Sequence, residues 1–197
     1  MVQPNITDIT APAKVALDSG LSGVAAINTI QSVMGVNLKT LRPEPSVEGY
    51  TTPGGYSSVA VKPIALAKVM SIAKMIASDY DGKKSLSGIG GIETGRDAAE
   101  FILLGSDTVQ VCTGVMVHGY PVIKKLCGGL QAFMAEHDFK SVEEFRGFAL
   151  PYFTTHKHLV ELQARAIEEK KAKKGLASDK DWSGDGFVKE AESMVAN

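Results

Sequence analysis

The stretch LSGIGGIETGRDAAEFILLGSDTVQVCTGVM, residues 86–116, decides the fold class of this chain. It opens with a short run typical of a buried strand, 86–89, and the pair Gly90-Gly91 follows, where the backbone can turn sharply. A second strand is predicted over 108–111, and Cys112-Thr113-Gly114 leave it just before another helix. Strands that alternate with helices in this way indicate a parallel sheet with right-handed crossovers, so the predicted fold class is α/β.

The segment between these two strands predicts an amphipathic helix. Thr94 can cap its first turn, and Asp97, three residues later, completes a short version of the capping box. Gly105 can end the helix. The apolar face is expected to consist of Ala98, Ala99, Phe101, Ile102 and Leu103.

The two turns that follow the strands are the candidate binding site. Each is expected to bring free backbone N–H groups and a helix N-terminus to one edge of the sheet, which is how phosphate is bound without a lysine. Three or four charge-assisted hydrogen bonds, of about 1.5–3 kcal/mol each, would hold a phosphate group. Glycine turns after strands are also common in α/β proteins of other functions, and the glycines of 88–95 do not fit the dinucleotide pattern G-x-G-x-x-G.

Composition narrows the class of protein. The chain has 197 residues, of which 44% are hydrophobic, and a net charge of −1, as expected for a soluble globular domain that does not bind nucleic acid. No apolar run approaches the length of about 20 residues that a membrane span needs. The first residues show neither a signal peptide nor a transit peptide. Two cysteines, Cys112 and Cys127, form no disulfide framework, which favours a reducing compartment such as the cytoplasm, with a plastid as the alternative in a plant.

The rest of the chain continues the alternation. The start of the chain, 1–5, reads as the exit of a strand, and 21–27 reads as a strand buried on both faces. A long irregular stretch, 31–62, contains several prolines and glycines and is expected to be a functional loop or a tolerated insertion. Helices are expected over 8–19, 63–78, 121–136, 141–145 and 156–174.

The expected packing faces of the helices follow from their apolar positions. Inward-facing side chains are predicted at Ala13, Val15, Ala16, Leu17, Ile64, Leu66, Ala67, Met70, Ile72, Ala73, Val122, Ile123, Leu126, Leu130, Phe133 and Met134. The lysines near residue 170 are expected to be solvated at a helix C-terminus, and Trp182, Phe187 and Met194 could fix the tail to a surface.

Three strands and a fragment amount to about half of a (β/α)8 barrel. Such barrels frequently bind phosphate in the loops after their last two strands. We therefore expect the C-terminal half of a (β/α)8 TIM barrel over 1–136, with parallel strands and alternating helices, and a helical C-terminal extension and tail over 137–197.

At this point the sequence resembles a known family. The matching pieces are QPNITD (3–8), AINT (26–29), PGGYS (53–57), KPIAL (62–66), SGIGGIETG (87–95) and QVCTG (110–114), and the tail 178–194 is similar as well. They resemble the C-terminal half of the FMN domain of dihydropyrimidine dehydrogenases of the plant or bacterial type, which are related to dihydroorotate dehydrogenase.

The resemblance implies a fold, a reaction and a set of site residues. It implies an FMN-binding barrel that reduces uracil or thymine to the 5,6-dihydropyrimidine with electrons from NADPH. It implies that Asn28 and Thr29 bind the pyrimidine, although an asparagine at this place is, taken alone, more typical of a turn closed by its own side chain. The residues that it implies for FMN binding are Gly54, Gly55, Gly90, Gly91, Ile92, Cys112 and Thr113.

The chain departs from the family at three places. The family has a lysine near the flavin where this chain has Met1, and it has a glycine near Ser58. Its general acid, a cysteine, would lie upstream of residue 1, so no catalytic residue is expected in this chain and its activity alone should be small. Packing is the expected role of the Cys112 side chain. Valine at Gly91 is expected to weaken flavin binding without unfolding the chain.

Other readings stay open. The chain could resemble a dihydroorotate dehydrogenase more closely in function, or it could be a half-barrel without catalysis that associates through open sheet edges. A homo-oligomer, or completion by the missing half of the barrel, is expected in either case. No metal site is indicated by the four histidines, and no Ser-His-Asp order is recognisable.

Overall fold

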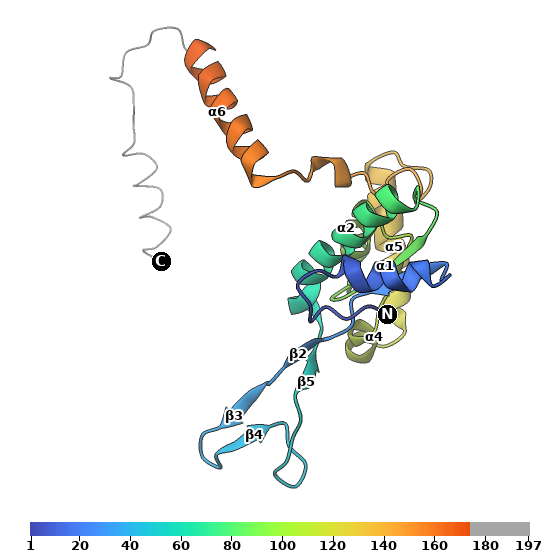
Figure 1. Ribbon diagram of the computed structural model, residues 1–197. Helices are drawn as coiled ribbons and strands as arrows, with labels where there is room; N and C mark the ends of the chain where they lie inside the picture. Colours follow the sequence, from blue (N-terminus) through green and yellow to red (C-terminus); the bar gives the residue numbers. More distant parts are fainter. Residues whose placement is uncertain (174–197) are drawn as a thin grey trace, which may run out of the picture. The chain divides into compact units, whose positions relative to one another are not determined.

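A computed structural model describes residues 1–173. The chain divides into two compact units, Met1–Tyr152 and Phe153–Asn197. The second unit, as far as it is described, consists of helix α6 (His156–Lys173), which agrees with the helix expected over 156–174 (Figure 1). The tail positions Trp182, Phe187 and Met194 lie outside the described residues. Within residues 1–173, no helix combines the length and hydropathy that a membrane crossing requires.

A small parallel sheet organises the first unit. Its strands are β1 (Gly23–Ala26), β6 (Ser85–Ile89) and β7 (Thr108–Gln110), in the order β1-β6-β7. Both pairings are parallel, with Ala25 opposite Ser87 and Gly88 opposite Val109. Val2 adds a single parallel bridge to Ala26, so the start of the chain does lie beside a strand. The parallel α/β class is confirmed, and the described residues form no closed barrel.

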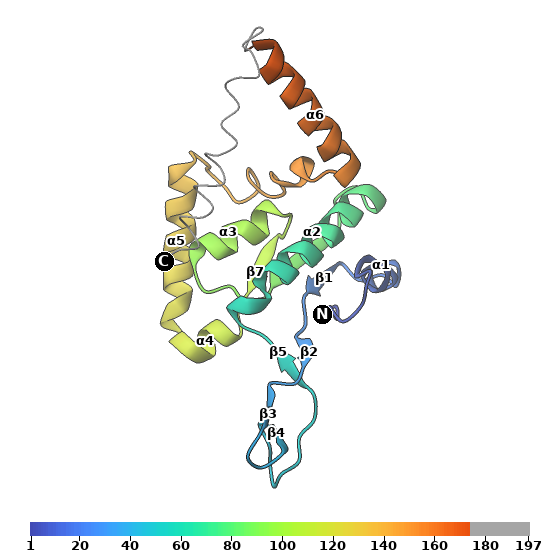
Figure 2. The same ribbon diagram turned by 90° about the vertical axis from the view of Figure 1, so that its left-hand side faces the viewer.

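Helices connect the strands and cover the sheet. They are α1 (Thr10–Asp18), α2 (Lys62–Asp79), α3 (Gly95–Leu103), α4 (Thr113–His118) and α5 (Pro121–Glu136). Figure 2 shows α3, α4 and α5 grouped together, with α2 on the other side of β7 and α1 beyond it. Two helices begin where proline predicted them to begin. Pro63 lies in the first turn of α2 and Pro121 begins α5, positions at which the N–H that proline lacks would have no partner within the helix.

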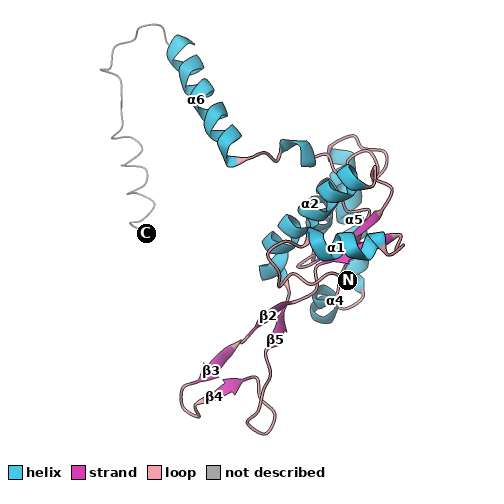
Figure 3. Ribbon diagram, viewed as in Figure 1, coloured by secondary structure: helices cyan, strands magenta, loops and turns pink. Residues whose placement is uncertain are grey.

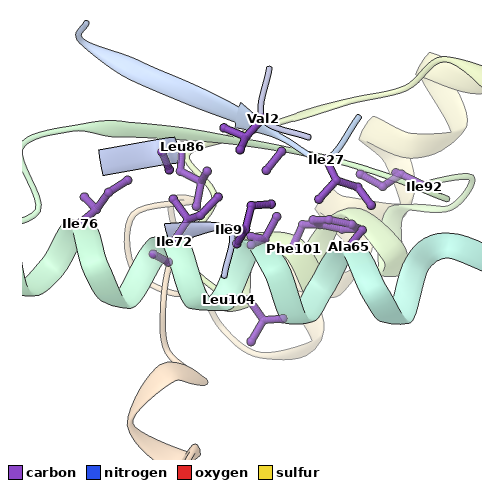
Figure 4. Packing of buried hydrophobic residues seen from close by; sticks show 14 of the residues in the cluster. Val2, Ile9, Ile27, Ala65, Ile72, Ile76, Leu86, Ile92, Phe101 and Leu104 are labelled. Atoms are coloured by element: carbon purple, nitrogen blue, oxygen red, sulfur yellow. The ribbon is translucent and has the colours of Figure 1, made fainter. Parts of the chain in front are cut away.

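The hydrophobic core lies between the sheet and the helices. Leu86 and Phe101 are at most 1% exposed, and they meet the side chains that α2 directs toward the sheet (Figure 4). Those α2 residues are Ala65, Val69, Ile72, Ala73 and Ile76. Alternate positions of β6 point the other way, where Ser87 accepts hydrogen bonds from Thr108 and Gln110, both at 2.9 Å. One face of the sheet is therefore apolar and covered, and the other is polar.

The predicted packing faces of the helices were only partly right. Ala13, Leu17, Ile72, Ala73, Val122 and Leu126 are buried as expected, but Val15 is 71% exposed and Ile64 is 45% exposed. Ala65, Val69 and Ile76 take the inner face of α2 instead. Apolar residues occur on every side of α2, so the sequence alone does not fix which face turns inward.

The stretch 31–62, expected to be irregular, contains two antiparallel ribbons. β2 (Ile30–Ser32) pairs with β5 (Gly54–Tyr56), and β3 (Gly35–Asn37) pairs with β4 (Arg42–Glu44). Figures 1 and 3 show these strands as an arm, residues 30–56, that extends away from the helices of the first unit. The expectation failed because three-residue strands that contain Pro43, Gly54 and Gly55 carry no alternation of apolar and polar residues.

Two predicted helix starts had different outcomes. The capping box at the start of α3 is confirmed, with Thr94 as N-cap and Asp97 at the third position. The helix expected over 141–145 is absent, and turns replace it. There the Glu144 carboxylate accepts from the backbone N–H of Lys140 at 2.7 Å, one residue earlier than a capping box requires. Phe145, fully buried, stacks against Phe139 and fixes this segment through packing.

Candidate functional site

The turns after β1, β6 and β7 line one cavity of about 460 Å³. They lie at the carboxyl ends of the parallel strands, where open α/β sheets bind their ligands. The remaining wall comes from the end of the arm, at Tyr56, Ser57 and Ser58, and from Val61. Met1 also lines the cavity. The two turns expected to act together, after β6 and β7, therefore do meet at one place, and the turn after β1 joins them.

Most of the sequence-predicted site residues line this cavity. They are Asn28, Thr29, Gly90, Gly91, Ile92, Cys112 and Thr113. Gly54 and Gly55 do not, because β5 pairs with β2 and turns them toward an open hollow that Gln3, Asn5 and Gln31 also line. A Cβ on Gly55 would collide with the Thr29 side chain, so the absence of a side chain there lets Thr29 approach the arm.

Asn28 partly shows the behaviour expected of a turn residue. Its side-chain oxygen accepts from the backbone N–H of Thr29 at 2.8 Å. Within residues 1–173 its amide NH2 group makes no hydrogen bond to protein, so this donor is available to a ligand in the cavity. The turn reading and the binding reading of Asn28 are therefore compatible.

The glycine pair has a backbone conformation that other residues rarely adopt. Gly90 has φ +141° and Gly91 has φ +74°. A Cβ on Gly91 would lie 2.8 Å from the carbonyl oxygen of Ser58 and 2.9 Å from the Cβ of Lys62. A larger side chain at Gly91 would therefore press into the wall formed by Ser58 and Lys62. A loss of stability is thus expected for valine at Gly91 in addition to the predicted loss of flavin binding.

Ser58 has a backbone conformation that favours glycine. Its φ is 73° and its ψ is −167°, a region that is almost exclusive to glycine. The backbone at this position, where the resemblance implied a glycine, is therefore one that glycine would adopt more easily than serine. The neighbouring Ser57 hydroxyl lies 3.1 Å from the Thr113 hydroxyl, which joins the end of the arm to the turn after β7.

Three backbone N–H groups at the start of α3 are used within its own capping box. The Asp97 carboxylate accepts from the backbone N–H of Glu93 at 3.1 Å and of Thr94 at 2.8 Å. Thr94 in turn accepts from the N–H of Asp97 at 3.2 Å. The capping box therefore uses these donors internally, and an anion in the cavity would depend on Gly91, Ile92 and the turn after β7.

The Lys62 amine forms an ion pair with the Asp97 carboxylate, which caps the start of α3. Its Nζ lies 2.5 Å from Asp97 and 2.9 Å from Glu100. The hydrogen bond to Asp97, followed by the one to Glu100, raises the pKa of the Lys62 amine. Burial raises the pKa of the Asp97 carboxyl, but the hydrogen bonds from Lys62, Thr94 and the backbone outweigh burial and hold it below 3.8.

We expect Lys62→Met to destabilise the first unit by about 1.5–3 kcal/mol at pH 7, because it removes a charged hydrogen bond to a carboxylate that is 14% exposed. Since the Asp97 pKa is lowered, this contribution is present above pH 3.8 and is lost as the pH falls through the folded-state pKa. Since the Lys62 pKa is raised, the contribution is also present below pH 10.5 and is lost as the pH rises beyond the folded-state pKa.

Urea unfolding at pH 7 and at successively lower pH measures this effect. The matched control is Lys83→Met, which removes a pair with Asp81 whose side chains are 79% and 82% exposed and which should change stability very little. An equal loss of stability in both variants, or a loss in Lys62→Met that does not shrink below pH 3.8, would contradict the assignment.

The charge of the lining is unusual for an anion site. Glu93 is the one charged residue among the described lining residues, and its carboxylate lies 3.1 Å from Nε2 of His118. Backbone N–H groups, hydroxyls and the side-chain amides of Asn28 and Gln110 are thus the donors that the described lining offers to an anion. Within residues 1–173, no group of three His, Cys, Asp or Glu side chains could hold a metal ion, and Cys112 and Cys127 are exposed free thiols.

Several lining residues were not singled out from the sequence. Tyr56, Ser57, Glu93 and Gln110 were quoted only as parts of matching motifs, without a role at the site. These positions depend on how the arm meets the turn after β7, which short-range sequence patterns do not encode.

The comparison with known families now adds to this geometry. A family model described as dihydroorotate dehydrogenase matches residues 1–134, about two thirds of the chain. The chain belongs to the dihydroorotate dehydrogenase family. All three turns of the cavity lie inside the matched region. The resemblance seen in the sequence motifs is therefore confirmed at the level of the family.

Three relatives of this chain differ in how similar their sequences are to it. Dihydropyrimidine dehydrogenase (NADP(+)), chloroplastic, of Arabidopsis thaliana is 69% identical over 195 residues, 98% of this chain and 46% of that protein. The NAD-dependent dihydropyrimidine dehydrogenase subunit PreA of Escherichia coli is 42% identical over 146 residues, 74% of this chain and 35% of that protein.

A third relative, dihydroorotate dehydrogenase B (NAD(+)), catalytic subunit, of Pyrococcus horikoshii, is 36% identical over 147 residues, 75% of this chain and 45% of that protein. The chain thus spans less than half the length of each of these three relatives. Similarity to the dihydropyrimidine dehydrogenase of the plant is the highest of the three and also covers the region beyond residue 152.

Proposed function

We propose that this chain is part of the FMN-binding domain of a dihydropyrimidine dehydrogenase, an oxidoreductase that reduces uracil or thymine to the 5,6-dihydropyrimidine with NADPH as the electron source. The observation that carries the proposal is the meeting of the turns after β1, β6 and β7 around one cavity. The 69% identity to the plant dehydrogenase supports the reaction. The name of that relative includes the chloroplast, which favours a plastid over the cytoplasm.

The turn residues fit the phosphate of FMN. Gly90 and Gly91 let the backbone turn tightly beside the cavity, where a Cβ would collide with Ala65 behind Gly90 and with Ser58 behind Gly91. Gly114 brings the turn after β7 close to Ile92. A Cβ on Gly114 would lie 3.0 Å from the Ile92 carbonyl oxygen. We assign the phosphate to the N–H groups of Gly91, Ile92, Cys112 and Thr113, with the hydroxyl pair of Ser57 and Thr113 beside them.

Asn28 and Thr29 are proposed to bind the pyrimidine. A carboxamide and a hydroxyl can match the alternating donors and acceptors of such a ring. When bound, FMN supplies the electron transfer to the ring, and the protein orients the two reactants against each other. Gly54 and Gly55, in the arm, are also proposed to take part in cofactor binding. Neither residue lines the cavity, so this role depends on where the arm lies when the cofactor is bound.

The architecture proposed for the whole protein is a (β/α)8 barrel. Residues 1–136 would form its C-terminal half and residues 137–197 a helical extension. The three-stranded parallel sheet supports this division, because within the described residues its β7 edge has no partner strand and its β1 edge has only the bridge to Val2. The other half of the barrel, or a second copy, would cover those edges, and the general acid and the lysine near the flavin would come from outside this chain.

Dihydroorotate is the alternative substrate, and a half-barrel without catalysis is the alternative function. The higher identity to the plant dihydropyrimidine dehydrogenase, 69% against 36% for the archaeal dihydroorotate dehydrogenase, favours the pyrimidine. A half-barrel that serves only as an interaction protein would have no need of the glycine conformations at residues 90 and 91.

Titration of the purified chain with FMN and with riboflavin, followed by flavin fluorescence, tests the proposal. Two or more charged hydrogen bonds to phosphate, of about 1.5–3 kcal/mol each, should make FMN bind at least about tenfold more tightly than riboflavin. Thr113→Val, which keeps the shape and removes a hydroxyl, should narrow this preference. Thr51→Val, on the arm, is the matched control and should leave it unchanged. Equal affinity for both flavins, or no binding of either, would reject the phosphate assignment.

A further inference from the structure

Helix α4 is short and has few packing contacts, since Val115 is the large side chain that it places against the core. It has six residues, and Gly114 is the buried one, whereas Met116 is 81% exposed and Val117 is 63% exposed. Helices of this length are unstable without outside contacts. Yet α4 follows directly on Cys112 and Thr113, so its placement determines where that turn lies against the cavity.

Two polar contacts hold α4, one at each end. At its beginning, the Thr113 hydroxyl lies 3.1 Å from the hydroxyl of Ser57, at the end of the arm. At its last residue, Nε2 of His118 lies 3.1 Å from the carboxylate of Glu93, in the turn after β6. These two contacts connect α4 to the end of the arm and to the turn after β6, both of which also line the cavity.

Glu93 is itself fixed, so it can serve as an anchor. Its backbone N–H donates to the Asp97 carboxylate at 3.1 Å, and Asp97 is held by Lys62 at 2.5 Å. The Glu93 side chain is 23% exposed and the His118 side chain 42%. A continuous chain of polar contacts thus runs from the start of α2, through the cap of α3, to the end of α4.

We infer that Glu93 and His118 are positioning residues, whose hydrogen bond keeps α4 on the turn after β6 and thereby holds the Cys112-Thr113 turn at the cavity. Neither residue needs to contact the flavin for this role. Where the inference concerns ligand affinity, it rests on the proposed function. The contact itself concerns the free chain and can be tested without any ligand.

Amide hydrogen exchange of the free chain tests the contact. His118→Ala and Glu93→Ala should each raise exchange in residues 113–119 by about threefold to tenfold, the effect of one hydrogen bond. The double variant should exchange no faster than either single variant, because both remove the same contact. Glu93→Gln, which can still bond to the imidazole, should largely restore protection. His156→Ala, in α6, is the matched control and should change neither the exchange of residues 113–119 nor the thermal midpoint. The midpoint of His118→Ala and Glu93→Ala should fall by only about 2–4 °C, the effect of one hydrogen bond lost from the native state.

FMN titration of the same variants tests the consequence. Affinity should fall about threefold to tenfold in His118→Ala and Glu93→Ala, without further loss in the double variant, and should recover in Glu93→Gln. Unchanged exchange in residues 113–119, or additive effects of the two substitutions, would overturn the inference. If the unmodified chain bound no flavin, the proposed function would fail, whereas the exchange experiment would still decide the role of Glu93 and His118.

Discussion

Alanine at Gly95 is expected to destabilise the first unit by about 3 kcal/mol, at the upper end of the range for overpacking. Gly95 begins α3 at its crossing with α5, and its Cβ would collide with the backbone of Gly129 and Leu130. Because the obstacle is the main chain of another helix, no rotation of a side chain can relieve the collision. The two helices would have to move apart, which would also expose part of the buried side chains of Leu126 and Phe101.

Gly128 provides the matched control for this substitution. It lies in α5, next to Gly129, and a Cβ there would meet nothing within 4 Å. Alanine in an open helix interior should stabilise by about 0.5–1 kcal/mol. Urea unfolding of the two variants should therefore give changes of opposite sign. Two changes of the same sign and similar size would contradict the close packing of α3 on α5.

Alanine at Gly91 is the second substitution with a large expected effect, about 2–3 kcal/mol of lost stability. Part of this cost is the left-handed conformation, φ +74°, which costs a residue with a Cβ about 1–2 kcal/mol. The rest arises because the Cβ would lie 2.8 Å from the Ser58 carbonyl oxygen and 3.0 Å from Cα of Val59. Both obstacles are backbone atoms, so the segment behind the glycine turn must shift.

Substitution of Gly82 measures the conformational part of this cost on its own. Gly82 has φ +68° and no atom within 4 Å of its Cβ position, so Gly82→Ala should lose only the conformational part, about 1 kcal/mol. The difference between the two variants in urea unfolding measures the contact between the glycine turn and Ser58. Equal losses would mean that the turn after β6 does not press against the end of the arm.

Much of the parallel fold could be predicted because its signals are local. The strands around Val24 and Leu86 are short runs of small or apolar residues, and the cap of α3 is a three-residue spacing that the structure reproduces. The arm could not be predicted, since its strands are three residues long and contain Pro43 and Gly54. In α2 the apolar residues encircle the helix, so Ile64 was placed inward although it lies outside.

The candidate site could be predicted where one turn supplies the residues, and not where two segments meet. Gly91 and Thr113 were found from turns that follow strands, and the cavity includes both. The contact between Ser57 and Thr113 joins residues 56 positions apart, which no local pattern encodes. Asp97 was recognised as a cap from the sequence, and its bonds to the N–H groups of Glu93 and Thr94 leave fewer donors at the start of α3 than a bare helix N-terminus would offer.

The central claim, that backbone N–H groups from two neighbouring turns together bind one phosphate, can be measured directly. In an amide-resolved NMR titration of the purified chain with FMN, the resonances of Gly91, Ile92 and Thr113 should shift together with a single dissociation constant, while those of Gly82 and Gly128 stay in place. The same three resonances should shift much less with riboflavin. Shifts that are confined to one of the two turns, or that do not distinguish FMN from riboflavin, would contradict the account.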